Sequence, residues 1–288
     1  MTLQSFIEDL ESGSYLIEWQ GFTLGVEKHQ WGELAYSCHG GQVVFFRPKG
    51  QEPLLWVSDC LKPFPAPIRG GVPICWPWFA DHPTEHSLPF HGTARISRWV
   101  LSDKEVSAAH ARLILKPVSE LRAGLDVHEE VCVDDHSICI RLTTQNRTKE
   151  TVSLTQALHS YLAVSERERV EIKGLSGCEY IDKNLGGERL KQDGPLNILS
   201  ATDRIYHTTK ETQLVDKGWG RTVEIKQSNS HSTIVWNPGE AASSMVDVGD
   251  AQVDSFVCIE AANTEVFDAI ILAPEEVCFI ETKISISN

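Results

Sequence analysis

Hydrophobic and polar residues alternate over short stretches along most of the chain, which predicts β-strands rather than helices. The clearest case is residues 137–143, where Ile138, Ile140 and Leu142 alternate with polar or small side chains, as in a strand buried on one face. The stretches expected to be strands are residues 14–19, 42–47, 54–57, 97–101, 111–115, 137–144, 154–164, 222–226, 233–236, 255–260, 267–273 and 276–286. Their spacing predicts an all-β fold, an antiparallel sandwich or barrel.

Helical periodicity is confined to the N-terminus. In residues 2–12 the apolar side chains recur at i, i+3, i+4 and i+7 from Leu3, which predicts one short amphipathic helix. No repeat, low-complexity tract or Pro/Ser-rich linker marks a boundary, so we expect residues 1–288 to form a single domain. Residues 60–89 and 182–204 lack periodicity and carry turn residues, and long irregular segments of this kind are expected to be functional loops.

Composition and charge narrow the classes of partner. With 41% apolar and 23% charged residues, the chain fits a water-soluble globular protein with a full core. Its 26 Lys and Arg against 40 Asp and Glu give a net charge of −14, which repels nucleic acid and anionic membranes. An anionic ligand would therefore need a local basic pocket, and neither a nucleic-acid partner nor a membrane partner is expected.

Cysteine usage and the N-terminus predict a cytoplasmic protein. The first residues carry no cationic segment of a secretory signal, and no apolar run approaches the ~20 residues of a membrane helix. The eight cysteines include no Cys-x-x-Cys motif, and several lie inside apolar strand-like runs. Reduced, buried thiols are therefore expected rather than disulfides.

The densest group of residues suited to chemistry is 68–79, followed by 88–95. Two adjacent glycines in the first segment would let a ligand approach the backbone, and the rings of Trp76, Trp78 and Phe79 could contact a sugar. The same residues also fit a Pro-rich core loop with two surface arginines. A metal site is a further alternative, although the spacing of its candidate ligands follows no regular element: Asp81, His82, Glu85, His86 and His91.

Two titratable residues interrupt apolar strand patterns. In residues 154–164, His159 shares its strand face mostly with small side chains, which leaves room for a ligand above the imidazole. Glu260 interrupts residues 255–262, a stretch that is apolar on both faces, and a buried carboxylate needs a cation, a donor or a pocket. Together they would make a general acid–base pair if they met in one cavity, while a hydrogen-bonded core histidine remains the alternative.

Six ordered blocks of sequence carry a family resemblance. They resemble the hexose-6-phosphate mutarotases (glucose-6-phosphate 1-epimerases) of the aldose 1-epimerase group, and they span residues 69–260. The blocks are Arg69-Gly70-Gly71-Val72-Pro73 with Trp76-Pro77, Leu88-Pro89-x-His91-Gly92-x-Ala94-Arg95, Ala157-Leu158-His159-Ser160-Tyr161, Thr202-Asp203-Arg204-Ile205-Tyr206, Val235-Trp236-Asn237-Pro238 and Cys258-Ile259-Glu260. The resemblance implies a large galactose-mutarotase-type antiparallel β-sandwich with few short helices.

The same resemblance implies an isomerase of carbohydrate metabolism. It carries over His159 as the general acid that protonates the ring oxygen, and Glu260 as the base that takes the proton of the C1 hydroxyl. Ring opening, rotation of the aldehyde and reclosure would then exchange the α and β anomers of an aldohexose 6-phosphate, with glucose 6-phosphate as the expected substrate. No metal or organic cofactor is expected, and of the possible oligomeric states a monomer is favoured.

The substrate-binding residues are also implied by the resemblance. Arg69 and Arg95 would bind the phosphate, since guanidinium groups match phosphate oxygens. His91 would orient the sugar or stabilise developing charge, and Asp203 would contact the sugar or hold an arginine. Phe90 departs from the glutamine that some relatives place before the histidine, so the substrate contact made there is lost or replaced.

Two other functions remain open at this stage. A mutarotase for unphosphorylated aldoses would use the same acid and base, with the arginines meeting only hydroxyls. A non-catalytic sugar-phosphate binding or regulatory module is the second alternative, but such a module would not need both His159 and Glu260. A metal enzyme of the small β-barrel kind ranks last.

Overall fold

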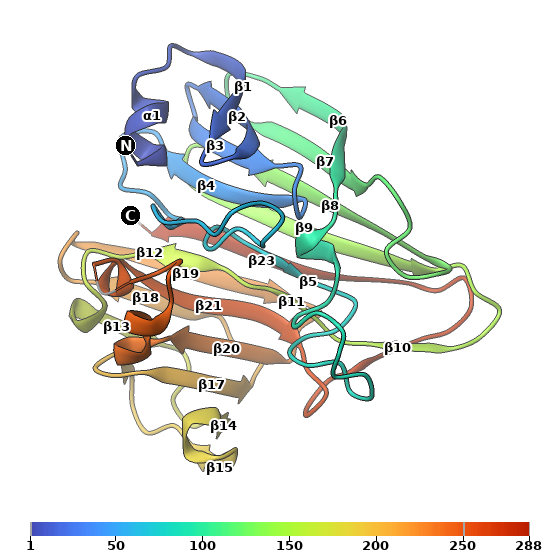
Figure 1. Ribbon diagram of the computed structural model, residues 1–288. Coiled ribbons are helices and arrows are strands. Elements are labelled where there is room, and N and C mark those ends of the chain that lie inside the picture. Colours follow the sequence, from blue (N-terminus) through green and yellow to red (C-terminus); the bar gives the residue numbers. More distant parts are fainter. Residues whose placement is uncertain (1, 250, 288) are drawn as a thin grey trace.

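The computed structural model of the protein describes residues 2–249 and 251–287 (Figure 1). The four-stranded N-terminal sheet contains, in order, β1 (Gly13–Trp19), β2 (Phe22–His29), β3 (Gly32–Ser37) and β4 (Gln42–Pro48). A two-stranded sheet pairs β10 (Val152–Leu154) with β22 (Ile270–Leu272). The helices are α1 (Leu3–Glu8) and the 3-10 helices η1 (Ala94–Ile96), η2 (Arg167–Arg169), η3 (Lys183–Leu185), η4 (Gly239–Ser244) and η5 (Val253–Ser255).

Two large sheets make up most of the remainder. The nine-stranded sheet has the spatial order β16 (Leu196–Asn197), β13 (Val170–Lys173), β18 (Thr212–Asp216), β19 (Arg221–Ser228), β23 (Val277–Ser287), β9 (Ser137–Asn146), β8 (Leu125–Val133), β7 (Ala111–Pro117) and β6 (Trp99–Val106). The eight-stranded sheet has the order β15 (Glu188–Lys191), β14 (Glu179–Asp182), β17 (Thr202–His207), β20 (Ser232–Asn237), β21 (Phe256–Asn263), β11 (Gln156–Leu158) and β5 (Ile74–Cys75), with β12 (Tyr161–Ala163) also paired to β21.

The sheets pack around a shared apolar core. Buried side chains of the N-terminal sheet and of both large sheets belong to one contiguous cluster. In β9 the alternating residues Ile138, Ile140 and Leu142 are fully buried, which confirms the predicted half-buried strand. Figure 1 shows the N-terminal sheet at one end of the molecule and β14 with β15 at the other. The prediction of an all-β, antiparallel β-sandwich is confirmed.

One predicted strand is interrupted where the site forms. Residues 154–164 were expected to be continuous, but they are divided into the end of β10, β11 and β12. At the break, the backbone N–H of His159 donates to the carbonyl of Pro73 at 3.1 Å, and that of Ser160 donates to Leu158. Because these bonds replace the regular ladder, His159 leaves the strand and its side chain can enter a cavity beside the sheet.

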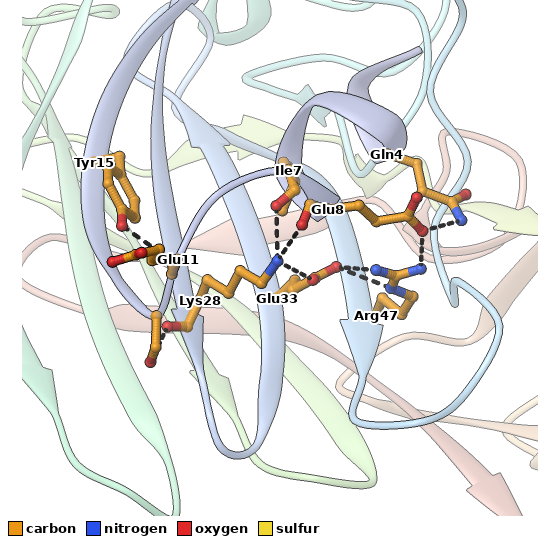
Figure 2. A network of polar contacts seen from close by, with 9 residues as sticks. Gln4, Ile7, Glu8, Glu11, Tyr15, Lys28, Glu33 and Arg47 are labelled. Carbon is orange, nitrogen blue, oxygen red and sulfur yellow. Dashed lines mark hydrogen bonds and ion pairs between the residues drawn. The ribbon is translucent and has the colours of Figure 1, made fainter.

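The N-terminal helix is shorter than the predicted range of residues 2–12. Lys28 of β2 donates from Nζ to the carbonyls of Ile7 and Glu8, both at 2.9 Å, and so takes up acceptors at the end of α1 (Figure 2). The carboxylate of Glu8 in turn binds Arg47 of β4 at 2.5 Å. The helix is thereby attached to the N-terminal sheet. In the part of the chain that the structure describes, no helix is long and apolar enough to cross a membrane.

Candidate active site

A pocket of about 260 Å³ lies at the eight-stranded sheet, and all the residues predicted to act in catalysis or to bind the sugar phosphate line it. Strands β17, β20 and β21 and the β11–β12 connection supply one wall, while loops and short helices supply the rest. The lining residues are Arg69, Phe79, Phe90, His91, Arg95, His159, Lys183, Asp203, Ile234, Trp236, Met245 and Glu260. A larger hollow of about 530 Å³ lies over the nine-stranded sheet beside Lys116, His128 and Arg147, but its histidine forms no ion pair with a carboxylate of the described residues.

The carboxylate of Glu260 and the imidazole of His159 meet in this pocket. His159 Nδ1 lies 3.4 Å from Glu260 Oε1, and the two side chains are 10% and 1% exposed. Burial, followed by the nearby Asp203, raises the pKa of Glu260 well above its ordinary value. Burial, followed by the positive charges of Arg69 and Arg95, lowers the pKa of His159 well below its ordinary value. Both shifts oppose the usual advantage of imidazole over carboxylate as the stronger base.

Aromatic packing fixes the orientation of the His159 ring. The ring stacks on Tyr161, with centroids 4.7 Å apart and planes 7° from parallel. It also meets the ring of Trp236 edge-on at 5.9 Å. The hydroxyl of Tyr161 accepts a hydrogen bond from Arg69 Nη1 at 3.0 Å. One tyrosine thus supports the imidazole and orients a cation of the same pocket.

His91 is held as a hydrogen-bond donor toward the pocket. Its Nδ1 accepts from the backbone N–H of Ala80 at 2.9 Å, so the neutral ring carries its proton on Nε2. Burial, followed by the charge of Arg95, lowers its pKa and favours this neutral form. The next residue, Gly92, has φ +79°, and a Cβ there would lie 2.1 Å from the carbonyl oxygen of Trp76. The glycine therefore permits the close backbone contact that positions His91.

The rings expected to contact a sugar divide between the core and the pocket. Trp76 is fully buried and donates from Nε1 to Thr144 Oγ1 at 3.0 Å, so its predicted sugar contact is wrong. Trp78 donates to the carbonyl of Pro89 and does not line the pocket. Phe79 does line it.

The adjacent glycines before these rings also act differently from the expectation. Cβ atoms added to Gly70 and Gly71 would lie 2.4 Å from Val57 Cα and 2.1 Å from the carbonyl oxygen of Val43. Both glycines also have positive φ. The close approach that they allow is therefore between backbone segments, and the contact holds the neighbouring Arg69 in place.

Arg69 is already paired with a carboxylate of the protein. Its Nε and Nη2 each lie 3.1 Å from Asp247 Oδ2, and the Asp247 side chain is 4% exposed. Sequence reasoning did not identify Asp247, which lies in an irregular segment after η4. The pairing fixes the guanidinium plane and compensates part of its charge.

Arg95 and Lys183 carry less compensated charge. Arg95 Nη2 donates to the carbonyl of Phe90 at 2.7 Å, while its buried Nε has no hydrogen-bond partner. Burial lowers the pKa of Arg95. Within the described ranges, neither Arg95 nor Lys183 has a carboxylate within 4.0 Å. Unpaired positive charge at a pocket favours an anionic ligand.

Lys183 is the pocket cation that sequence reasoning missed. It lies in η3, inside residues 182–204, the segment expected to be a functional loop. Its Nζ is 5.4 Å from the ring centroid of Phe79. Asp203 lines the same pocket, and burial raises its pKa. It forms no ion pair with an arginine in the described residues, which leaves a sugar contact as its expected role.

The histidine-rich loop does not gather metal ligands. His82 Nδ1 accepts from the backbone N–H of Glu85 at 3.1 Å, and the loop is mostly exposed. Among the residues that the structure describes, three candidate ligand atoms converge elsewhere, at His159, Cys258 and Glu260.

Comparisons with known proteins place this site in a family context. Residues 26–285 match the sequence profile of the family described as aldose 1-epimerase. The chain is 30% identical over 243 residues to an Escherichia coli protein named "Putative glucose-6-phosphate 1-epimerase", with 82% of each chain covered. A Cenchrus ciliaris protein of the same name is 30% identical over 251 residues, covering 79% of this chain and 74% of that one.

A solved structure supports the fold over the full length. The crystal structure named "putative mutarotase" from Salmonella typhimurium superposes with a TM-score of 0.90 and 24% identity, and 100% of both chains is covered. A galactose mutarotase-like protein from Clostridium acetobutylicum superposes with a TM-score of 0.71 and 14% identity, covering 98% of this chain and 99% of that one. At these identities the two structures establish the fold alone.

Proposed function

Because the chain belongs to the aldose 1-epimerase family, we propose that it interconverts the α and β anomers of an aldohexose 6-phosphate, with glucose 6-phosphate as substrate. One arrangement carries the proposal. The contact of His159 with Glu260 supplies an acid and a base, and the same pocket holds Arg95 and Lys183 without carboxylate partners in the described chain. The names of the curated relatives support a phosphorylated hexose as substrate.

The reaction requires only proton transfers between this pair and the sugar. Glu260 takes the proton of the C1 hydroxyl while His159 donates one to the ring oxygen, so the C1–O5 bond breaks and an open-chain aldehyde forms. Rotation about C1–C2 turns the aldehyde. On reclosure His159 takes the proton of the attacking C5 hydroxyl, and Glu260 returns its proton to the former carbonyl oxygen. No atom is gained or lost overall.

The opposite pKa shifts suit a reaction that runs both ways. Each group acts as acid in one direction and as base in the other, so a large difference in basicity would slow one direction. Burial raises the pKa of Glu260 and lowers that of His159, and both shifts act against the difference in basicity that the two groups have in water. Because Glu260 must be ionised to start the reaction, the rate should fall on acidification at a higher pH than for an exposed glutamate.

The remaining polar residues bind and orient the sugar phosphate. The phosphate carries about −1.5 to −2 charges at pH 7, and Arg95 and Lys183 supply the matching positive charge. Arg69, held by Asp247 and Tyr161, presents a fixed guanidinium to the same ligand. The Nε2 proton of His91 can donate to a sugar oxygen. This arrangement overcomes the repulsion that the net charge of −14 imposes on an anion.

We place this activity in the cytoplasm, on a free small-molecule sugar phosphate and without a metal cofactor. Cytoplasmic reducing conditions fit the eight cysteines, all of which are unpaired. The proposed proton transfers use only side chains of this chain. Treatment with a chelator should therefore not lower the activity, and a loss that a divalent ion restores would contradict this part of the proposal.

Substitution of the acid and the base tests the proposal. Glu260→Gln and His159→Ala should each lower kcat for anomer exchange of glucose 6-phosphate by about 10²–10⁴-fold, measured by NMR exchange spectroscopy. Glu129→Gln is a matched control, because Glu129 is also a fully buried glutamate but lies in the nine-stranded sheet outside the pocket. His128→Ala is the corresponding histidine control. Losses below about tenfold in both site variants would refute the assigned roles.

A further inference from the structure

A thiol lies directly beside the proposed acid and base. Cys258 and Glu260 are two positions apart in β21, so their side chains lie on the same face of the strand. The sulfur of Cys258, a carboxylate oxygen of Glu260 and a ring nitrogen of His159 all lie within 4.8 Å of one another. All three side chains are buried. Strand β12 pairs Tyr161 with Cys258, which brings the preceding His159 close to the same part of β21. Nitrogen, sulfur and oxygen ligand atoms thus converge beside the pocket, which His159 and Glu260 line.

Two of these side chains have unsatisfied polar atoms. Glu260 Oε2 is buried without a hydrogen-bond partner, and buried His159 Nδ1 has the 3.4 Å contact with Glu260 Oε1 but no hydrogen bond. Buried polar atoms without partners are unusual and favour a further ligand. The thiol of Cys258 has no part in the proposed sugar chemistry. Imidazole nitrogen, thiolate sulfur and carboxylate oxygen are together the ligand types that bind Zn²⁺ in proteins.

We propose that His159, Cys258 and Glu260 bind a thiophilic divalent cation such as Zn²⁺, and that this ion inhibits the enzyme. The ion is an inhibitor rather than a cofactor, because it would coordinate His159 and Glu260, the two groups that must transfer protons. The inhibitory half of the proposal rests on the proposed function, whereas ion binding does not. Binding releases the thiol proton of Cys258 and, when it is present, the carboxyl proton of Glu260 to solvent.

The geometry requires only a small adjustment. Zinc bonds of about 2.0–2.3 Å in a tetrahedral site place ligand atoms about 3.3–3.8 Å apart, so side-chain movements of about 1 Å suffice. Three protein ligands leave a fourth position for water or a sugar hydroxyl, as in other open zinc sites. The thiolate and carboxylate neutralise the two positive charges of the ion, which offsets repulsion from Arg69 and Arg95.

Inhibition should appear mainly in kcat. A carboxylate of Glu260 that coordinates the ion cannot take the proton of the C1 hydroxyl, even when the phosphate of the sugar is bound. The cations that bind the phosphate are not ligands of the ion. KM for the sugar phosphate should therefore change less than kcat.

The test uses Cd²⁺ for direct binding and Zn²⁺ for activity. Cys132 and Cys139 face each other across β8 and β9, so a Cys132→Ser/Cys139→Ser background removes this second possible thiol site. In that background, titration with Cd²⁺ should produce an ultraviolet thiolate-to-metal absorption that saturates at one Cd²⁺ per protein. Cys258→Ala should abolish it, and Cys75→Ala, which removes a buried thiol of β5 in the same sheet, should not.

Activity measurements complete the test. Zn²⁺ should lower kcat of the background protein, EDTA should restore it, and Cys258→Ala should raise the inhibitory concentration at least about tenfold. Cys258→Ser, which removes the sulfur but keeps a side chain of similar size, should raise the inhibitory concentration of Zn²⁺ as well. This variant separates loss of the sulfur ligand from a change in packing. Absence of the Cd²⁺ absorption in the background protein, or its persistence in Cys258→Ala, would overturn the site. Binding without loss of activity would overturn the inhibition. The absorption decides ion binding even if no sugar is turned over.

Discussion

Replacement of Arg95 gives the sharpest test of phosphate binding at this pocket. Its guanidinium has no carboxylate within 4.0 Å in the described part of the chain, and its buried Nε has no partner. Arg95→Ala therefore removes positive charge without exposing a new unpaired carboxylate. Arg69→Ala would also leave the buried Asp247 without its main partner, so its effects on binding and on stability would be mixed.

The expected loss follows from charge and burial. Two unit charges about 4 Å apart interact by about 4 kcal/mol at an effective dielectric constant of about 20. Loss of one partner of a desolvated pair costs about 2–5 kcal/mol. Because about 1.4 kcal/mol corresponds to a factor of ten, Arg95→Ala should raise KM for glucose 6-phosphate roughly 30- to 4,000-fold. Any activity on glucose itself should change little, since that sugar offers no phosphate.

The assay is NMR exchange between the α and β anomers at a series of sugar phosphate concentrations. Arg98→Ala is the matched control, because Arg98 is an exposed arginine three residues further along the chain that does not line the pocket. It should leave KM unchanged. An unaltered KM in Arg95→Ala would show that the phosphate binds elsewhere and would refute this assignment of the substrate-binding residues.

Two further predictions concern single side chains. Lys183→Met should raise the steady-state KM for glucose 6-phosphate by less than about fivefold, because Lys183 is exposed and an exposed ion pair with the phosphate contributes under ~1 kcal/mol. A 100-fold change in KM would contradict this prediction. Burial raises the pKa of Glu129, so the free energy of unfolding should fall by up to ~1.4 kcal/mol per unit as pH rises above ~4.3, until the folded-state pKa is reached. Glu129→Gln should remove this contribution, so that the free energy of unfolding in urea falls less steeply with pH, and parallel curves for the two proteins would contradict the prediction.

The strand pattern predicted the fold class but missed several strands. The inward side chains of β8 are apolar except for Glu129, which is fully buried with no hydrogen-bond partner for either carboxylate oxygen. A glutamate at a core position disrupts the alternation from which strands are recognised. The opposite error occurred at residues 154–164, where a pattern compatible with one continuous strand concealed the break at His159. That break depends on a hydrogen bond to Pro73, which is distant in sequence.

The candidate site was predictable where a residue conflicted with its local pattern. Glu260 in a fully apolar strand is the clearest case, and all residues of β21 are indeed buried. Lys183 gave no such signal, because a lysine in an irregular segment is ordinarily solvated. Asp247 likewise resembles a surface residue, and its burial depends on the packing of its loop against Arg69. Trp76 was assigned wrongly because sequence does not distinguish a ring in the core from a ring at a ligand.

Selectivity for a phosphorylated sugar is tested most directly by comparing anomer exchange of two substrates. With catalytic amounts of the protein, NMR exchange rates between α and β anomers are measured for glucose 6-phosphate and for glucose under the same conditions. We expect kcat/KM for the phosphorylated sugar to exceed that for glucose by at least about 30-fold, the low end of the loss expected for Arg95→Ala. Equal acceleration of both sugars would contradict the phosphate assignment, and no acceleration of either would contradict the enzyme.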